Sequence, residues 1–196
     1  MLKAALRKAM LQKRLHYSAA EVNKRSEQIG QLFLALFSLS KVKTLHLFLP
    51  ISRYNEINTW YLIQQLQQHY PHISLVVPVT NLKEGTLSHH RFTATTKLVE
   101  NKWGILEPHA AEPVAETVID IVLIPLLGFD EQGHRVGYGK GFYDRFLALC
   151  RPDVLKIGLS LEAPVAKITD VYPGDVLLDY AVTPEKVYAF RKEAIL

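Results

Sequence analysis

The chain has 196 residues, of which 48% are hydrophobic and 21% are charged, and this is the size and balance of one globular domain with a substantial core. Its formal net charge of +4 is too small an excess to demand a nucleic-acid partner. The longest apolar stretch, over 32–39, is too short to span a bilayer, and the single Cys150 cannot form an internal disulfide. We therefore expect one domain over residues 1–196, in a reducing cytoplasm, neither exported nor inserted in a membrane.

The amino-terminal part predicts two helices followed by alternating strands and helices. Ser18 and Glu21 have the spacing of a capping box, in which each side chain accepts a hydrogen bond from a free N–H group at the start of a helix. Up to residue 100 we expect helices over 2–16, 19–37 and 58–70, strands over 44–49 and 74–79, and a strand or hairpin over 86–100.

The remainder of the chain continues this alternation. We expect a buried strand over 119–124, a helix over 142–150, a strand over 156–160, and further strand at 177–178 and 185–190. Strands that alternate with helices indicate a mostly parallel, doubly wound sheet. Ligands of such sheets bind in the crevice at the carboxyl ends of the strands.

The segment 125–145 follows one of these strands and has the composition of an anion-binding loop. Gly137, Gly139 and Gly141 alternate with larger residues, so the main chain can approach a phosphate closely. The spacing matches neither the Walker motif nor the dinucleotide fingerprint. A glycine-rich turn with a charged rim remains the alternative.

Charged side chains in this segment extend the interpretation. Lys140 supplies a mobile positive charge, and Arg135 supplies a fork of donors suited to phosphate. The helix that follows points the positive end of its dipole at the same place. Asp144 either pairs with Arg145 or holds Mg²⁺. Near the amino terminus, Lys3 and Arg7 are one helical step apart and share a face, where they could contact one polyphosphate or simply be solvated.

Three segments of the chain resemble one known family. The pattern over 125–145, which reads Pro-Leu-Leu-Gly-Phe-Asp-x-x-Gly-x-Arg-x-Gly-Tyr-Gly-x-Gly-Phe-Tyr-Asp-Arg, resembles the signature of the 5-formyltetrahydrofolate cyclo-ligases, also called 5,10-methenyltetrahydrofolate synthetases. The Lys-x-x-Leu-Arg pattern over 3–7 and the Trp-Gly-Ile-x-Glu-Pro pattern over 103–108 are similar to two other segments of that family. The resemblance implies a three-layer α/β/α fold with a mostly parallel central sheet, Rossmann-like and of the NagB/RpiA/CoA-transferase-like type.

The resemblance also implies a reaction and its participants. The family closes 5-formyltetrahydrofolate, which can be polyglutamylated, to 5,10-methenyltetrahydrofolate with ATP and Mg²⁺ and releases ADP and phosphate. The formyl oxygen is activated by phosphoryl transfer and N10 then attacks. Lys140, Arg135 and Tyr138 are the catalytic residues that the resemblance implies. The implied ATP site comprises Lys3, Arg7, Arg135, Val136, Gly137, Tyr138, Gly139, Lys140, Gly141, Phe142 and Tyr143.

Folate and metal contacts follow from the same resemblance. Glu56 is expected to face the pterin ring, because one carboxylate can accept hydrogen bonds from both donors of the ring edge. The alternative is that Glu56 only marks the start of a helix, where the helix dipole favours an acid. The implied folate site comprises Ile51, Glu56, Trp103, Tyr138, Gly139, Lys140, Gly141 and Phe142. The resemblance assigns Mg²⁺ to Asp144 and Asp175. Members often have His-Asp where this chain has Gly-Asp at 174–175, so Asp179 is kept as the alternative to Asp175. The segment 52–54 carries extra residues relative to many members.

Two other classes of function stay open at this stage. A diverged member could bind nucleotide or folate and regulate without turnover, and a basic module could bind nucleic acid. We interpret His89 and His90 as part of a surface loop rather than a zinc site, and Cys150 as a buried thiol. We expect a monomer that needs neither nucleic acid nor a membrane.

Overall fold

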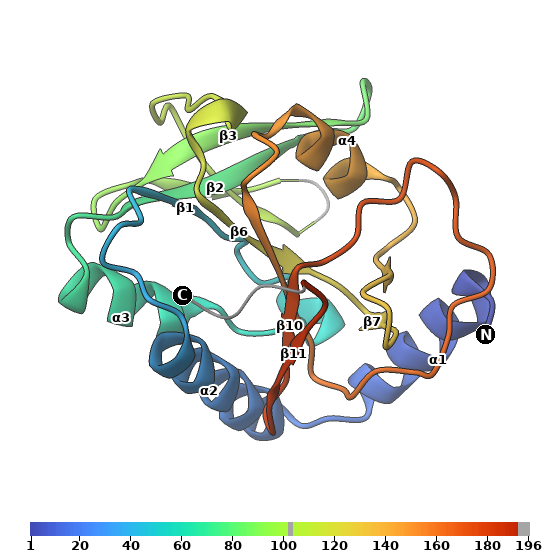
Figure 1. Ribbon diagram of the computed structural model, residues 1–196. Helices are drawn as coiled ribbons and strands as arrows, with labels where there is room; N and C mark the ends of the chain where they lie inside the picture. The colour runs from blue at the N-terminus through green and yellow to red at the C-terminus, as the bar shows by residue number, and fades with distance from the viewer. Residues whose placement is uncertain (102–103, 192–196) are drawn as a thin grey trace.

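The computed structural model describes residues 1–101 and 104–191 (Figure 1). Its α-helices are α1 (Lys3–Leu15), α2 (Ala19–Leu36), α3 (Trp60–His69) and α4 (Phe142–Leu149), with 3-10 turns η1 (Ser52–Tyr54) and η2 (Glu116–Val118). Its strands are β1 (Thr44–His46), β2 (Ser74–Asn81), β3 (Thr86–Phe92), β4 (Leu98–Glu100), β5 (Leu106–Pro108), β6 (Ile121–Pro125), β7 (Gly128–Phe129), β8 (Arg135–Val136), β9 (Leu155–Leu159), β10 (Tyr180–Val182) and β11 (Val187–Ala189).

Seven strands form the central sheet, in the order β11-β10-β9-β6-β1-β2-β3. The five inner strands run parallel to their neighbours, while the edge strands β11 and β3 are antiparallel. The strands nearest the centre are buried on both faces, as expected for parallel strands that are covered by helices. The mostly parallel sheet inferred from the sequence is confirmed.

Helices cover both faces of this sheet, which makes the fold a three-layer α/β/α arrangement (Figure 1). On one face, Ile121 and Leu123 of β6 pack in the core cluster that contains the buried side chains of α2 and α3. On the other face, Val122 and Ile124 pack with Phe146 of α4. The alternation along β6 thus assigns one side of the strand to each helical layer.

The segment 125–145 is more structured than a loop. It begins with the short antiparallel pair β7–β8, which packs against α1 through Leu6 and Val136. The turn between the two strands is organised by the fully buried Asp130, whose carboxylate accepts hydrogen bonds from the backbone N–H groups of Gln132, His134 and Ile168 at 2.8–3.0 Å. Only residues 137–141, between β8 and α4, form the open glycine-rich loop.

Most expected elements are present, with shifted ends. The capping box at α2 is confirmed, since Ser18 accepts from the N–H of Glu21 and Glu21 accepts from the N–H of Ser18. The strand expected at 177–178 is wrong: that segment is irregular, and the chain enters the sheet only at β10. No helix within the described residues has the length and apolar character needed to cross a membrane.

Candidate active site

A cavity of about 600 Å³ opens at the carboxyl ends of the parallel strands and is lined by α1, the turn at η1 and the glycine-rich loop. The expected site residues that line it are Lys3, Arg7, Ile51, Glu56, all of Arg135 through Tyr143, Asp144 and Asp175. Trp103 lies outside the described residues. The structure therefore brings together side chains from four distant parts of the sequence.

The glycine-rich loop gains its shape from two left-handed glycines and a contact with α1. Gly139 and Gly141 have φ angles of 88° and 67°, which L side chains rarely adopt. The Arg7 guanidinium donates through Nε to the carbonyl of Gly137 at 2.9 Å. A Cβ atom at Gly139 would lie 3.1 Å from Arg7 Cζ, so glycine is also required there for the close approach of α1.

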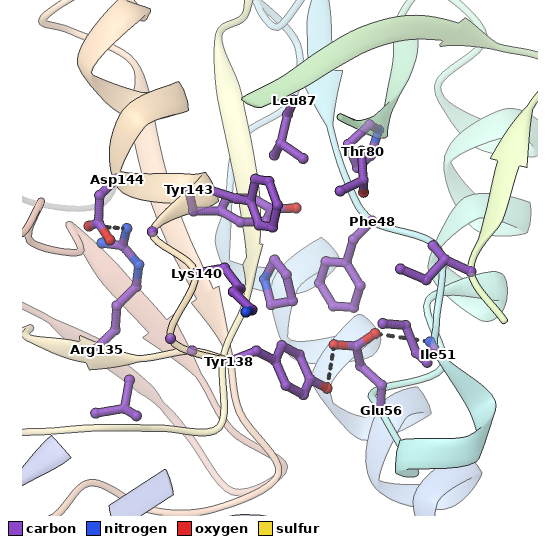
Figure 2. Close-up of a pocket in the computed structure, with 18 of the residues that line it drawn as sticks. Phe48, Ile51, Glu56, Thr80, Leu87, Arg135, Tyr138, Lys140, Tyr143 and Asp144 are labelled. Atoms are coloured by element: carbon purple, nitrogen blue, oxygen red, sulfur yellow. Dashed lines mark hydrogen bonds and ion pairs between the residues drawn. The ribbon is translucent and has the colours of Figure 1, made fainter. Parts of the chain in front are cut away.

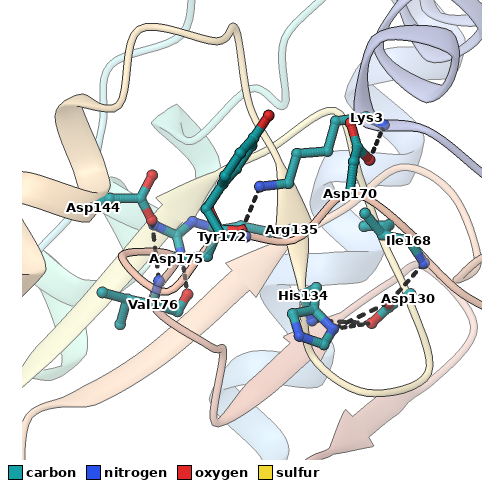
Figure 3. A network of polar contacts seen from close by, with 10 residues as sticks. All are labelled: Lys3, Asp130, His134, Arg135, Asp144, Ile168, Asp170, Tyr172, Asp175 and Val176. Atoms are coloured by element: carbon teal, nitrogen blue, oxygen red, sulfur yellow. Dashed lines mark hydrogen bonds and ion pairs between the residues drawn. The ribbon is translucent and has the colours of Figure 1, made fainter.

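Arg135 lies between two of the acids that line the cavity. Its Nη2 donates to Asp144 Oδ1 at 2.7 Å, and its Nη1 donates to the carbonyl of Val176 (Figure 3). Burial lowers the pKa of Arg135, and the charges of Asp144 and Asp175 oppose that shift. Asp144 also accepts from the N–H of Val176 at 3.2 Å, so one carboxylate joins α4 to the 170–179 segment.

Asp144 does not pair with Arg145, which was one of the two partners considered from the sequence. Arg145 instead donates to two backbone carbonyls, to Gly85 through Nε and to Lys140 through Nη2, both at 2.7 Å. These bonds fasten the β2–β3 turn to the glycine-rich loop. Thr80 and Leu87, which flank that turn, line the same cavity, so Arg145 holds one wall of the site in place.

A second charged group stands where α1 meets the carboxy-terminal part of the chain. The Lys3 ammonium donates to Asp175 Oδ2 and lies 4.9 Å from the centroid of the Tyr172 ring (Figure 3). Partial burial raises the pKa of Asp175, but hydrogen bonds from Lys3 and from the N–H of Tyr172 outweigh it and hold this pKa below its ordinary value. Asp179, the fallback metal contact, is not among the cavity-lining residues; it accepts from Lys156 N at 2.8 Å.

At the opposite end, Glu56 is a buried carboxylate with two protein donors (Figure 2). Its Oε2 accepts from the N–H of Ile51 at 2.9 Å, and its Oε1 accepts from the Tyr138 hydroxyl at 3.0 Å. Burial raises the pKa of Glu56, although the Arg14 charge and the two hydrogen bonds act against it. Burial also raises the pKa of Tyr138, so its hydroxyl remains a donor at neutral pH.

Lys140 and Tyr143 complete the middle of the cavity. Lys140 is exposed and makes no ion pair with any residue that the structure describes. The buried Tyr143 hydroxyl has no hydrogen-bond partner within the same set of residues, and burial raises its pKa. Both groups therefore keep donors that a bound molecule can use.

Three buried polar residues near the site were missed or misplaced by sequence reasoning. Arg14 of α1 donates to the carbonyl of Leu126 at 2.7 Å and approaches the Tyr138 hydroxyl at 3.3 Å. His46 and His89 form a buried pair, with ring centroids 5.0 Å apart, beneath Tyr143. His89 thus belongs to the interior of β3, and the surface-loop assignment was wrong. The available signal was the strand or hairpin expected over 86–100, within which His89 falls.

The acids could hold a metal ion only together with ligands from a bound molecule. No group of three or more histidine, cysteine or acidic side chains in 1–101 and 104–191 has the arrangement of a metal site. Mg²⁺, however, is commonly bound by one or two carboxylates, with phosphates and water as its other ligands. Asp144 and Asp175, both on the Arg135 side of the cavity, fit that requirement.

Comparisons with known proteins agree with this geometry. A model of the 5-formyltetrahydrofolate cyclo-ligase family matches residues 1–184. The 5-formyltetrahydrofolate cyclo-ligase of Mycoplasma genitalium is 29% identical over 181 residues, which cover 92% of this chain and 96% of the relative. The NMR structure of Aquifex aeolicus 5,10-methenyltetrahydrofolate synthetase has a TM-score of 0.78 at 29% identity and covers 100% of this chain and 96% of its own. The structure of a 5,10-methenyltetrahydrofolate synthetase from Mycoplasma pneumoniae has a TM-score of 0.70 at 28% identity, and the match covers 94% of this chain and 100% of that one.

Proposed function

The chain belongs to the 5-formyltetrahydrofolate cyclo-ligase family, and we propose that it closes 5-formyltetrahydrofolate to 5,10-methenyltetrahydrofolate with conversion of ATP to ADP and phosphate. The observation that carries the proposal is one cavity with two chemically different ends. A buried carboxylate, Glu56, stands at one end, and a glycine-rich loop with Arg135 and Lys3 stands at the other. A flat donor-rich ring and a polyphosphate can therefore be held side by side.

Glu56 suits the pterin end of the folate. Its two protein donors leave lone pairs on both oxygens, and the 2-amino and N3–H groups of the pterin present two donors along one edge. The aromatic ring of Phe48 and the side chain of Ile51 line the cavity beside it and can cover the faces of the ring (Figure 2). Trp103, which the family resemblance also assigns to the folate, stays a proposal without a position.

The cationic end suits the ATP phosphates. Backbone N–H groups of the loop from Gly137 to Gly141, the Arg135 fork and the Lys140 ammonium can neutralise the charge of the transferring group. Lys3 and Arg7 contact the same region from α1. We assign catalysis to Lys140, Arg135 and Tyr138, because Arg135 and Lys140 bring positive charge to the cavity and Tyr138, on the same loop, reaches Glu56.

The chemistry needs no protein nucleophile. The γ-phosphorus forms a bond to the formyl oxygen while its bond to the β-phosphate bridging oxygen breaks, which releases ADP. The folate N10 then attacks the activated formyl carbon, N10 loses its proton, and the carbon–oxygen bond breaks with release of phosphate. Closure of the ring depends on alignment of N10, the formyl group and the phosphoryl group within one cavity.

We assign a magnesium ion to Asp144 and Asp175. When bound, Mg²⁺ would neutralise phosphate charge at the loop. Asp144 is held by Arg135 and the N–H of Val176, and Asp175 by Lys3, so both carboxylates are fixed before a ligand arrives. An arriving metal would share these carboxylates with the cations that now hold them.

The test is the absorbance of the methenyl product during incubation of the protein with 5-formyltetrahydrofolate, ATP and Mg²⁺. Parallel samples lack ATP or the metal, and a Lys140→Gln variant is measured beside the wild type. We expect product only with both additions, and a loss of roughly 100-fold in kcat for the variant, the size typical for removal of one transition-state donor.

The same experiment tests the second candidate, a diverged protein that binds nucleotide or folate without turnover. Folded wild-type protein that binds ATP yet forms no product would contradict the cyclo-ligase proposal and favour that candidate. Product that forms without ATP would contradict the phosphoryl-transfer mechanism. Product that requires ATP but not Mg²⁺ would contradict only the metal assignment.

A further inference from the structure

One cationic side chain of the cavity stands apart from the phosphate region. Among the described residues, the basic side chains that line the cavity are Lys3, Arg7, Arg53, Arg135 and Lys140. Four of these belong to α1 or to the segment from β8 to α4, whereas Arg53 lies on η1, three residues before Glu56. Arg53 therefore places positive charge at the folate end, where the polyphosphate is not expected.

The turn that carries Arg53 is firmly positioned. Asn55, which ends η1, has a left-handed backbone with φ 47°, and its side-chain Nδ2 donates to the carbonyls of Arg14 at 3.0 Å and Tyr17 at 2.8 Å. Tyr54 packs against Tyr138 with ring centroids 5.8 Å apart. The turn is thus fixed both to the end of α1 and to the wall of the cavity.

The Arg53 guanidinium is oriented but has no ionic partner in the described part of the chain. Its Cζ lies 4.7 Å from the centroid of the Tyr54 ring, which fixes one face of the planar group. The guanidinium also lies near Gly104, where a Cβ atom would be 3.8 Å from Arg53 Nη1 and 3.4 Å from Glu100 Oε1. Arg53 forms no ion pair with a described residue, so its fork of donors remains available to a ligand.

The substrate class supplies a matching anion. With the pterin edge on Glu56 and the formyl group toward the phosphates, the aminobenzoyl part can follow the apolar wall made by Ile105 and Leu106, which directly follow Gly104 beside Arg53. Beyond it the folate carries the carboxylates of its glutamyl group, and an arginine fork binds a carboxylate through two parallel hydrogen bonds. We propose that Arg53 is a specificity residue that binds a glutamyl carboxylate of the folate; this rests on the proposed function.

The test compares two substrates, one with and one without the glutamyl carboxylates. One is 5-formyltetrahydrofolate, and the other is its analogue in which an uncharged propylamide replaces the glutamate. Initial rates are measured with saturating ATP and Mg²⁺ for the wild type, Arg53→Gln, Arg53→Lys and the control Lys24→Gln, which removes an exposed charge from α2. Glu100→Gln is added because Glu100 is the acid next to Arg53 at Gly104.

We expect Arg53→Gln to raise the KM for 5-formyltetrahydrofolate about tenfold, equivalent to about 1.4 kcal/mol, with kcat within about twofold of the wild type. The KM for the propylamide is expected to stay unchanged, as is the KM for ATP. Arg53→Lys should recover part of the loss, Glu100→Gln should lower the KM, and Lys24→Gln should match the wild type. A KM increase that is equal for both substrates, or an increase for ATP alone, would overturn the assignment.

Failure of this proposal can be told apart from failure of the proposed function. If the wild type forms no product, the proposed function fails. Equilibrium binding of the two compounds, followed by quenching of protein fluorescence, then tests Arg53 by itself. Tighter binding of the glutamate compound that disappears in Arg53→Gln supports the carboxylate site, and equal binding of both compounds by the wild type refutes it.

Discussion

Tyr138 donates a 3.0 Å hydrogen bond to Glu56, although 82 residues separate them in sequence. The bond joins the glycine-rich loop, which we assign to the ATP phosphates, to the only acid at the other end of the cavity among the described lining residues. A nucleotide that shifted the loop would therefore change the environment of the carboxylate that we assign to the pterin.

Replacement of Glu56 by glutamine should separate folate binding from stability. We expect kcat/KM for the folate to fall roughly 100-fold, because hydrogen bonds to charged groups contribute about 1.5–3 kcal/mol each. The KM for ATP should not change. Steady-state kinetics check both expectations, and the control is Glu27→Gln, which changes an exposed acid of α2. Retention of wild-type kcat/KM would contradict the assignment of Glu56.

The same variant should be more stable than the wild type at neutral pH. Burial raises the pKa of Glu56 above its unfolded value of 4.5, so the folded state keeps the proton to higher pH than the unfolded state does. The free energy of unfolding of the wild type therefore falls as pH rises from 4.5 through the folded pKa. Thermal unfolding at pH 7 should show a higher Tm for Glu56→Gln, and a lower one would contradict the burial argument.

Asp144→Asn should weaken the dependence on magnesium without loss of the fold. Asparagine can still accept from Arg135 and Val176 through its amide oxygen but lacks the charge that Mg²⁺ prefers. We expect the Mg²⁺ concentration for half-maximal rate to rise at least about tenfold, with Tm within a few degrees of the wild type. Asp153→Asn is the control, because Asp153 pairs with Arg151 and does not line the cavity. An unchanged Mg²⁺ titration would contradict the assignment.

Arg145→Ala should loosen one wall of the cavity. The variant loses the bonds from Arg145 to the carbonyls of Gly85 and Lys140, which hold the β2–β3 turn against the loop. We expect amide hydrogen exchange over residues 81–87 to increase about tenfold, because each hydrogen bond contributes about 1 kcal/mol. Arg151→Ala, which breaks ion pairs to Asp120 and Asp153 outside the cavity, should leave this segment unchanged. Equal exchange in all three proteins would contradict the role of Arg145.

The buried histidine pair should make the protein sensitive to acid. Burial is the main cause that lowers the pKa of His89 from 6.5 to about 4, and Glu116 at 3.7 Å opposes it. The unfolded chain therefore binds a proton at His89 before the folded protein does. Stability should fall on the order of 2–3 kcal/mol between pH 7 and 4 from this residue.

Urea unfolding across this pH range checks the prediction. The variant His89→Phe keeps a ring against Phe146, which His89 stacks on at 3.9 Å between centroids. It should lose less stability on acidification than the wild type. His16→Gln removes an exposed histidine and should behave as the wild type does. Parallel pH profiles for His89→Phe and the wild type would contradict the prediction.

Features carried by local sequence could be predicted, and features made by tertiary contacts could not. The capping box at Ser18 and the buried strand β6 depend on short-range spacing and periodicity, and both are present. The pair β7–β8 was missed because strands of two residues carry no periodicity. The strand expected at 177–178 was wrong because two leucines are equally compatible with an irregular segment that packs on the core.

The site residues divide in the same way. The expected sheet indicated that loops after its strands gather along one edge, and the family resemblance added Lys3 and Arg7 of α1. It did not reveal which charges pair, because Arg135 with Asp144 and Lys3 with Asp175 are contacts set by the packing of whole elements. The interior position of His89 was missed because the polarity of two adjacent histidines outweighed the weak alternation of an edge strand.

The ion pair between Lys3 and Asp175 spans 172 residues and lies at the end of the cavity that we assign to the ATP phosphates. During synthesis, a chain released up to α4 already contains Glu56 and the glycine-rich loop, yet it lacks the acid that fixes Lys3. Contacts so distant in sequence form late, because the entropy of closing the intervening chain must first be overcome. Nucleotide affinity should consequently arise at the end of folding, and a nascent chain shorter than 175 residues should not compete with the finished enzyme for ATP.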